Sequence, residues 1–141
     1  MHYAYPYDLS VAADGITVTF PDVPGAITCG DTEAEAVARA EDALVSMLAV
    51  LVQDGAAIPV PSPPNGHTVA TVPLLEAAKL ALHSAMLASK VSNVDLARRL
   101  DMNEKAVRRL RDPLHRSHIG QVVEALHILG RQVSLEVIEA A

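Results

Sequence analysis

The period of the hydrophobic pattern changes part-way along the chain, and this change limits the possible folds more than any other feature. Ile16, Val18 and Phe20 alternate with threonines, which is the pattern of a half-buried strand. Residues 3–11 alternate in the same way, and Asp14–Gly15 between the two runs predicts a hairpin turn. In the second half of the chain, apolar residues recur at helical spacing instead. The sequence therefore predicts an α+β half followed by an all-α half.

The first alternating run predicts one inward-facing stripe, made of Tyr3, Tyr5, Tyr7, Leu9 and Val11. Pro6 has no amide donor, so we expect this strand to lie at an edge or to bulge there. Residues 26–29 predict a third strand. We expect a helix to follow, with Thr32 as its N-cap and Glu35 at the capping-box position, and to end near Asp54–Gly55.

Four prolines keep residues 58–66 extended, and residues 68–72 predict a fourth strand. Residues 1–73 are thus expected to form a β-β-β-α-β domain, and residues 74–141 a second, helical domain. Helices are predicted at residues 75–89, 92–100, 103–110 and 119–129.

A last alternating run follows the helices at residues 132–138. Val133, Leu135 and Val137 alternate there with polar residues and predict a single strand. This strand has no partner within a helical domain, so we expect it to pair with a second copy of the chain. The protein is therefore predicted to form a homodimer or a higher oligomer through these three residues.

Charge is divided unequally between the two halves. Residues 1–75 contain nine acidic residues and one basic residue, a net charge of −8, whereas residues 76–141 contain ten basic and eight acidic residues, a net charge of +2. An acidic half suits a basic protein partner, and a half with clustered arginines suits phosphates. For the N-terminal half, a merely solubilising surface is the alternative.

Residues 93–112 have the pattern of two short helices joined by a tight turn. Ser92 and Asn103 are good N-caps, Ala97 is small enough for a close helix crossing, and Asp101 tolerates left-handed backbone in the turn. This spacing resembles the helix-turn-helix of phage-repressor-like regulators, except that Asp101 replaces the usual glycine.

The second of these helices has a basic face that we expect to point outward, with Glu104, Lys105, Arg108, Arg109 and Arg111. Asn103, Lys105 and Arg108 are the candidates for base contacts, and Arg109 and Arg116 for phosphates. The candidate DNA-binding residues are Ser92, Asn103, Lys105, Arg108, Arg109 and Arg116. The alternative is a solvated basic face on an ordinary helical bundle.

The segment from Phe20 to Thr32, with the sequence FPDVPGAITCGDT, followed by Glu35-Ala36 and a helix, resembles the HicB antitoxin family. The resemblance covers roughly residues 3–62. It implies a partial RNase H-like fold, and as partner a small, basic, mRNA-cleaving HicA toxin whose catalytic histidine is covered. It also implies repression of the antitoxin's own operon through palindromic operator DNA. The candidate toxin-binding residues are Phe20, Asp22, Val23, Pro24 and Asp31.

Two other functions are weighed against this one. The first is a stand-alone helix-turn-helix regulator whose N-terminal domain senses a ligand or a protein. The second is an RNase H-like nuclease with Asp8, Asp22 and Asp31 as metal ligands, but the acidic residues form no DxD pair. We therefore expect neither catalysis nor a cofactor.

The remaining features favour a plain intracellular protein. The histidines have no HExxH-like spacing, and the single cysteine, Cys29, can form neither an internal disulfide nor a CxxC motif. The chain has no signal-peptide pattern and no apolar stretch of the roughly 18 residues that a membrane span needs. We expect a cytoplasmic protein without a metal site or a membrane partner.

Overall fold

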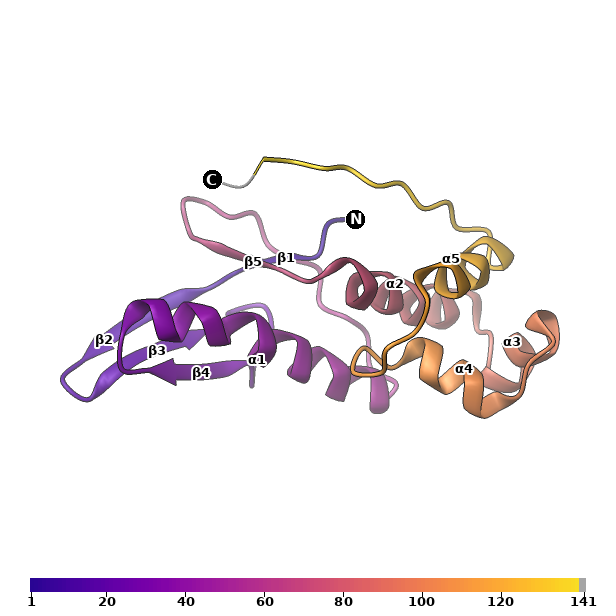
Figure 1. Ribbon diagram of the computed structural model, residues 1–141, viewed down its shortest axis with the longest axis horizontal. Coiled ribbons are helices and arrows are strands. Elements are labelled where there is room, and N and C mark those ends of the chain that lie inside the picture. The colour runs from indigo at the N-terminus through magenta and orange to yellow at the C-terminus, as the bar shows by residue number, and fades with distance from the viewer. Residues whose placement is uncertain (140–141) are drawn as a thin grey trace.

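The computed structural model describes residues 1–139 and has a mixed α+β fold (Figure 1). The strands are β1 (Ala4–Pro6), β2 (Asp8–Ala12), β3 (Gly15–Thr19), β4 (Ile27–Gly30) and β5 (Val69–Thr71). The helices are α1 (Glu33–Gln53), α2 (Leu74–Ser89), α3 (Asn93–Leu100), α4 (Glu104–Arg111) and α5 (Ile119–Ile128). The predicted change from strands to helices is confirmed.

The N-terminal half is built around an antiparallel sheet with the order β2-β3-β4. Helix α1 packs mainly on β4 and also on β3, and buries an alanine- and leucine-rich stripe. The predicted capping of α1 is confirmed, because the Thr32 hydroxyl accepts a hydrogen bond from the Glu35 amide at 3.2 Å. The Glu35 carboxylate in turn accepts one from the Asp31 amide at 3.2 Å. These contacts satisfy amides at the helix start that have no partner within the helix.

The prediction of one continuous first strand was wrong, because the chain changes sheets near Pro6. β1 pairs with β5 in a separate two-stranded sheet, whereas β2 pairs with β3. Tyr5, Pro6 and Tyr7 are all buried, so the in-out alternation breaks there. As a result Leu9 and Val11, which were expected to continue the buried stripe, are exposed.

The second half contains the four predicted helices, and each of their ends lies within one residue of the expected position. Their apolar faces form a second core that includes Leu82, Leu96, Val107 and Leu126. Helix α2 contributes to both cores, because Leu80 belongs to the N-terminal cluster while Leu82 belongs to the helical one. Helix α2 therefore packs against both halves of the chain.

The predicted strand at residues 132–138 is absent from the structure of the single chain. This segment leaves α5 as an extended, exposed chain without strand pairing (Figure 1). Val133, Leu135 and Val137 are all exposed. A strand needs a neighbour for its main-chain hydrogen bonds, and no part of residues 1–139 supplies one here. Pairing with a second copy stays a prediction.

Candidate functional site

Helices α3 and α4 are joined by Asp101–Asn103, and both helix starts are capped as predicted. The Ser92 hydroxyl accepts a hydrogen bond from the Asp95 amide at 3.1 Å, and the Asn103 side chain accepts one from the Ala106 amide at 2.8 Å. Asp101 adopts the left-handed conformation, with φ of 54°. This backbone closes α3 and starts the turn into α4, as glycine does in similar motifs.

Three cationic side chains are exposed on α4: Lys105, Arg108 and Arg109. Arg108 donates two hydrogen bonds to one Glu104 carboxylate oxygen, at 2.7 and 3.1 Å. The Arg108 side chain is 68% exposed, so this ion pair contributes little to stability and is screened by salt. Arg108 is therefore able to exchange the carboxylate for another anion.

Arg111 does not belong to this outward face, and the prediction that it does was wrong. Its guanidinium donates to the Asn93 side-chain oxygen at 2.6 Å and to Nδ1 of His83 at 2.6 Å. Burial lowers the pKa of Arg111, but an arginine keeps its charge in proteins. Arg111 thus ties α4 to α3 and α2 instead of facing solvent.

His83 is fully buried and joins the two halves of the chain. Its Nε2 lies 2.8 Å from the Ala56 carbonyl oxygen, just after α1. The carbonyl can only accept and Arg111 can only donate, so Nε2 carries the proton and Nδ1 is the acceptor. Burial, and to a lesser extent Arg111, lowers the pKa of His83, while the bond to Ala56 acts in the opposite direction. The imidazole is therefore neutral in the folded chain.

Lys79 holds the C-terminal end of α4. Its ammonium donates to the Arg109 carbonyl at 2.7 Å, to the Asp112 carbonyl at 3.0 Å and to the Ser117 hydroxyl at 2.8 Å. Carbonyls at a helix C-terminus have no partners within the helix and carry the negative end of its dipole, so a cation stabilises them. Burial lowers the pKa of Lys79, whereas Asp112 and Glu76 raise it.

The sequence interpretation assigned no role to Lys79 or His83. The signal was their spacing of four residues, which puts two polar side chains on one face of an otherwise apolar helix. Both side chains are fully buried on that face of α2, where they contact the segment containing α4.

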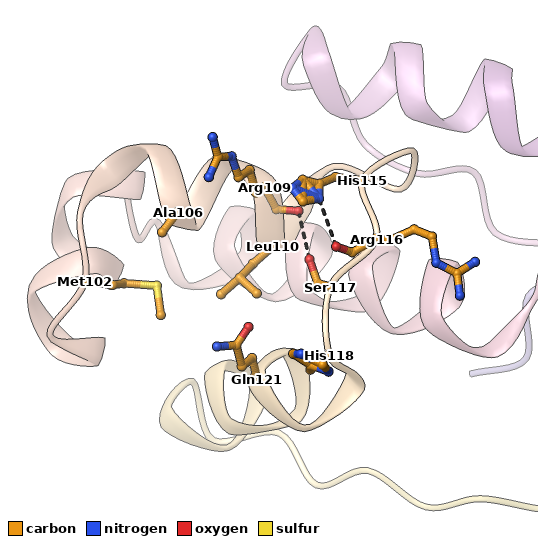
Figure 2. Close-up of a pocket in the computed structure, with 9 residues that line it drawn as sticks. All are labelled: Met102, Ala106, Arg109, Leu110, His115, Arg116, Ser117, His118 and Gln121. Atoms are coloured by element: carbon orange, nitrogen blue, oxygen red, sulfur yellow. Dashed lines mark hydrogen bonds between the residues drawn. The ribbon is translucent and has the colours of Figure 1, made fainter.

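A small hollow lies between α4, the loop after it and the start of α5, and Figure 2 shows the residues that line it. Met102 and Leu110 point into the hollow, whereas the guanidinium groups of Arg109 and Arg116 point away from it (Figure 2). The two candidate phosphate ligands thus stand at the rim of one hollow, with Arg109 on α4 and Arg116 on the loop.

The candidate toxin-binding residues have different surroundings. Phe20 and Val23 are 2% and 1% exposed and belong to the core, so they offer almost no surface to a partner. Asp22 accepts hydrogen bonds from the Ser62 amide at 2.7 Å and the Ser62 hydroxyl at 2.6 Å, and thereby anchors the proline-rich segment. Pro24 and Asp31 are exposed.

The described part of the chain shows neither a metal cluster nor a membrane helix. Within residues 1–139, no three histidine, cysteine or acidic side chains lie together as metal ligands would. In the same range, every helix is too short or too polar to cross a bilayer.

Comparison with known proteins gives matches along the chain. Residues 2–81 match the family model described as the HicB-like antitoxin of a bacterial toxin-antitoxin system. Antitoxin HicB 2 of Photorhabdus laumondii is 37% identical over 131 residues, which are 93% of this chain and 94% of that protein. Antitoxin HicB of Escherichia coli is 38% identical over 133 residues, which are 93% and 96% of the two chains. The chain belongs to the HicB antitoxin family.

The similarity to other HicB antitoxins is not confined to the N-terminal half. Antitoxin HicB of Pseudomonas fluorescens is 36% identical over 141 residues, which are 99% of this chain and 96% of that protein. The shared sequence therefore includes α3, α4 and the C-terminal segment. An antitoxin function of the HicB type is supported, and the stand-alone regulator considered as an alternative is not favoured.

Proposed function

We propose that this HicB antitoxin neutralises a HicA-like, mRNA-cleaving toxin by direct binding and represses its own operon by binding palindromic operator DNA. The observation that carries the proposal is the similarity to proteins named HicB antitoxins over more than nine-tenths of the chain. The family match implies a toxin partner. Both activities are binding activities that act in the cytoplasm, and no residue has a catalytic role.

The two activities are assigned to different halves. Residues 1–73 are the toxin-binding domain, with a partial RNase H-like fold, and residues 74–141 are the DNA-binding and dimerisation domain. Two separate hydrophobic cores support this division, although α2 contributes to both. The net charges of −8 and +2 support it as well, because a basic toxin and a DNA backbone attract surfaces of opposite sign.

In the second domain, α3, the turn and α4 act as a helix-turn-helix, with α4 in the major groove. Asn103, Lys105 and Arg108 at and after the start of α4 contact base edges. Arg109 and Arg116 bind phosphates, and Ser92 is a further DNA-binding residue. The exposure of these side chains supports the assignment, and so does the weak surface ion pair that Arg108 gives up on binding.

A palindromic operator calls for a two-fold symmetric protein. Val133, Leu135 and Val137 supply the dimer contact by pairing residues 132–138 with the same segment of a second copy. Their alternation and exposure support this pairing, because an unpaired apolar strand is otherwise an aggregation hazard. Oligomers larger than a dimer are compatible with the same contact.

In the first domain, Pro24 and Asp31 are the members of the predicted toxin-binding set that have free surface. Phe20 and Val23 support the loop between β3 and β4, which contains Pro24, through the core, and Asp22 joins this loop to Ser62. Their contribution to toxin binding is therefore to hold the loop in shape.

Co-expression tests the function. The HicA-type gene from the same operon is induced alone and together with this chain, and growth and co-purification are measured. Growth arrest that this chain relieves, with both proteins eluting together, supports the antitoxin role. Arrest that persists although this chain is abundant and folded contradicts it.

A further inference from the structure

Strand β2 carries an apolar strip that the fold leaves uncovered. Leu9 lies opposite Val18 and Val11 opposite Ile16 in the β2-β3 pairing. Residues directly opposite each other in antiparallel strands point to the same face, so Leu9 and Val11 share the face on which α1 buries Val18. Helix α1 packs on β4 and β3, which leaves Leu9 38% exposed and Val11 77% exposed.

The same strand is one of the two edges of its sheet. Within residues 1–139, β2 pairs with β3 on one side, and no strand pairs with its other side. An edge strand presents unpaired amides and carbonyls to which a strand of another protein can add. Thr68 and His67 contact Tyr7 and Asp8 at the start of this edge, so residues 9–12 offer main-chain hydrogen-bonding groups and, beside them, an apolar surface that continues the core.

Charge decides which occupant this surface fits. Residues 1–75 carry a net charge of −8, and Asp8 and Asp14 lie at the beginning and just beyond the end of β2. A second copy docked edge to edge would bring two such acidic halves together, which costs free energy. A basic protein gains from the same field, both in steering and in the final contact.

We propose that β2 is the surface on which the basic toxin docks, by adding a strand to the β2 edge and packing apolar side chains on Leu9 and Val11. This inference rests on the proposed antitoxin function and specifies its surface. It moves the main toxin contact away from the buried Phe20 and Val23 to a strand outside the predicted set.

The chain offers a matched pair of variants to test this surface. Val11 and Val60 are 77% and 75% exposed and both lie in the acidic half. Val11→Arg and Val60→Arg add the same charge to that half, so any loss of long-range attraction is common to both. Only Val11→Arg places a bulky cation on the β2 strip, where arginine also opposes strand addition.

The measurement is the Kd of each full-length variant for a catalytically inactive HicA-type toxin, with thermal melting and light scattering in parallel. We expect Val11→Arg to weaken toxin binding at least about tenfold relative to Val60→Arg, as loss of one buried apolar contact does. Both variants are expected to melt like the parent chain, since neither valine is buried.

Equal toxin affinity of the two variants overturns the β2 surface while the antitoxin function stands, because the parent chain still binds. A change of oligomeric state in Val11→Arg with unchanged toxin affinity also overturns it, because the occupant is then a second copy. If the parent chain itself does not bind the toxin, the antitoxin function fails rather than the assigned surface. If Val11→Arg does not fold, the Kd of Leu9→Ser for the toxin, compared with that of Val60→Arg, tests the same apolar strip.

Discussion

Replacing Arg108 and Arg111 by methionine, one at a time, is expected to separate DNA binding from stability. The two arginines lie three residues apart on α4, and both were expected on its outward face. Within residues 1–139 the Arg108 side chain bonds to Glu104 on its own helix, whereas Arg111 bonds to Asn93 and to the buried His83. The same substitution therefore removes very different contacts.

The expected loss of stability depends on which polar groups each substitution leaves without a partner. Arg111→Met leaves Nδ1 of the buried His83 without a donor, and a buried polar group without a partner costs about 1–3 kcal/mol. Asn93 is partly exposed and can regain a water. Arg108→Met removes an exposed ion pair worth about 0–1 kcal/mol. For a chain of this size, a loss of about 2 kcal/mol lowers Tm by roughly 5–10 °C.

Circular-dichroism melting measures the stability of both variants, and fluorescence anisotropy measures their binding to a DNA fragment from upstream of the operon. We expect Arg111→Met to melt roughly 5–10 °C lower and Arg108→Met to melt like the parent. At a temperature where both are folded, Arg108→Met is expected to bind DNA at least about tenfold more weakly, as loss of a base contact does. The reverse pattern, with Arg108→Met unstable and Arg111→Met unaffected, would refute the contacts assigned to the two side chains.

Three further perturbations test the buried contacts. Burial lowers the pKa of His83 below its usual 6.5. As the pH falls, the imidazole is therefore protonated in the unfolded chain before it is protonated in the folded chain, which favours unfolding. The contribution of His83 to stability is complete above about pH 6.5 and decreases at lower pH. Urea unfolding at about pH 7.5 and about pH 5.5 measures the decrease in the free energy of unfolding between these two pH values, and His83→Gln should make that decrease smaller. An added Cβ at Gly30 would lie 2.6 Å from the Ala36 amide nitrogen, so Gly30→Ala should lower the free energy of unfolding by about 1–3 kcal/mol. Gly120→Ala meets nothing within 4 Å, so an equal loss there would contradict this steric cause. Lys79→Met leaves the end of α4 without its cation, and we expect a lower melting temperature together with faster amide exchange in residues 109–112. Unchanged exchange there would contradict the role of Lys79.

Features set by neighbouring residues were predictable from the sequence. Thr32, Ser92 and Asn103 each bond to an amide three residues ahead, so the start of each helix depends on a few adjacent positions. The left-handed backbone of Asp101 was predictable for the same reason. Helix bounds in the second half could be predicted because caps and apolar spacing agree there.

Features set by distant partners were not predictable in this way. Alternation in residues 3–11 indicated one strand, but β1 pairs with β5, which lies more than 60 residues away in sequence. Pro6 correctly indicated an irregularity in the strand, although it could not show that the chain changes sheets there.

The direction of Arg111 could have been inferred from the helical spacing. It follows the buried Val107 by four residues and Leu110 by one, which places it beside the apolar stripe of α4. Its charge alone suggested an outward position. Only the partners, His83 on α2 and Asn93 at the start of α3, explain how a cation is accommodated there.

Titration of the active HicA-type toxin with the purified full chain tests whether this chain inactivates a ribonuclease by binding it. Cleavage of an mRNA substrate is followed at each ratio of the two proteins. We expect cleavage to fall linearly and to stop when the antitoxin saturates the toxin at a fixed stoichiometry. Cleavage that continues at the same rate in the presence of excess folded chain would contradict inactivation of the toxin by binding.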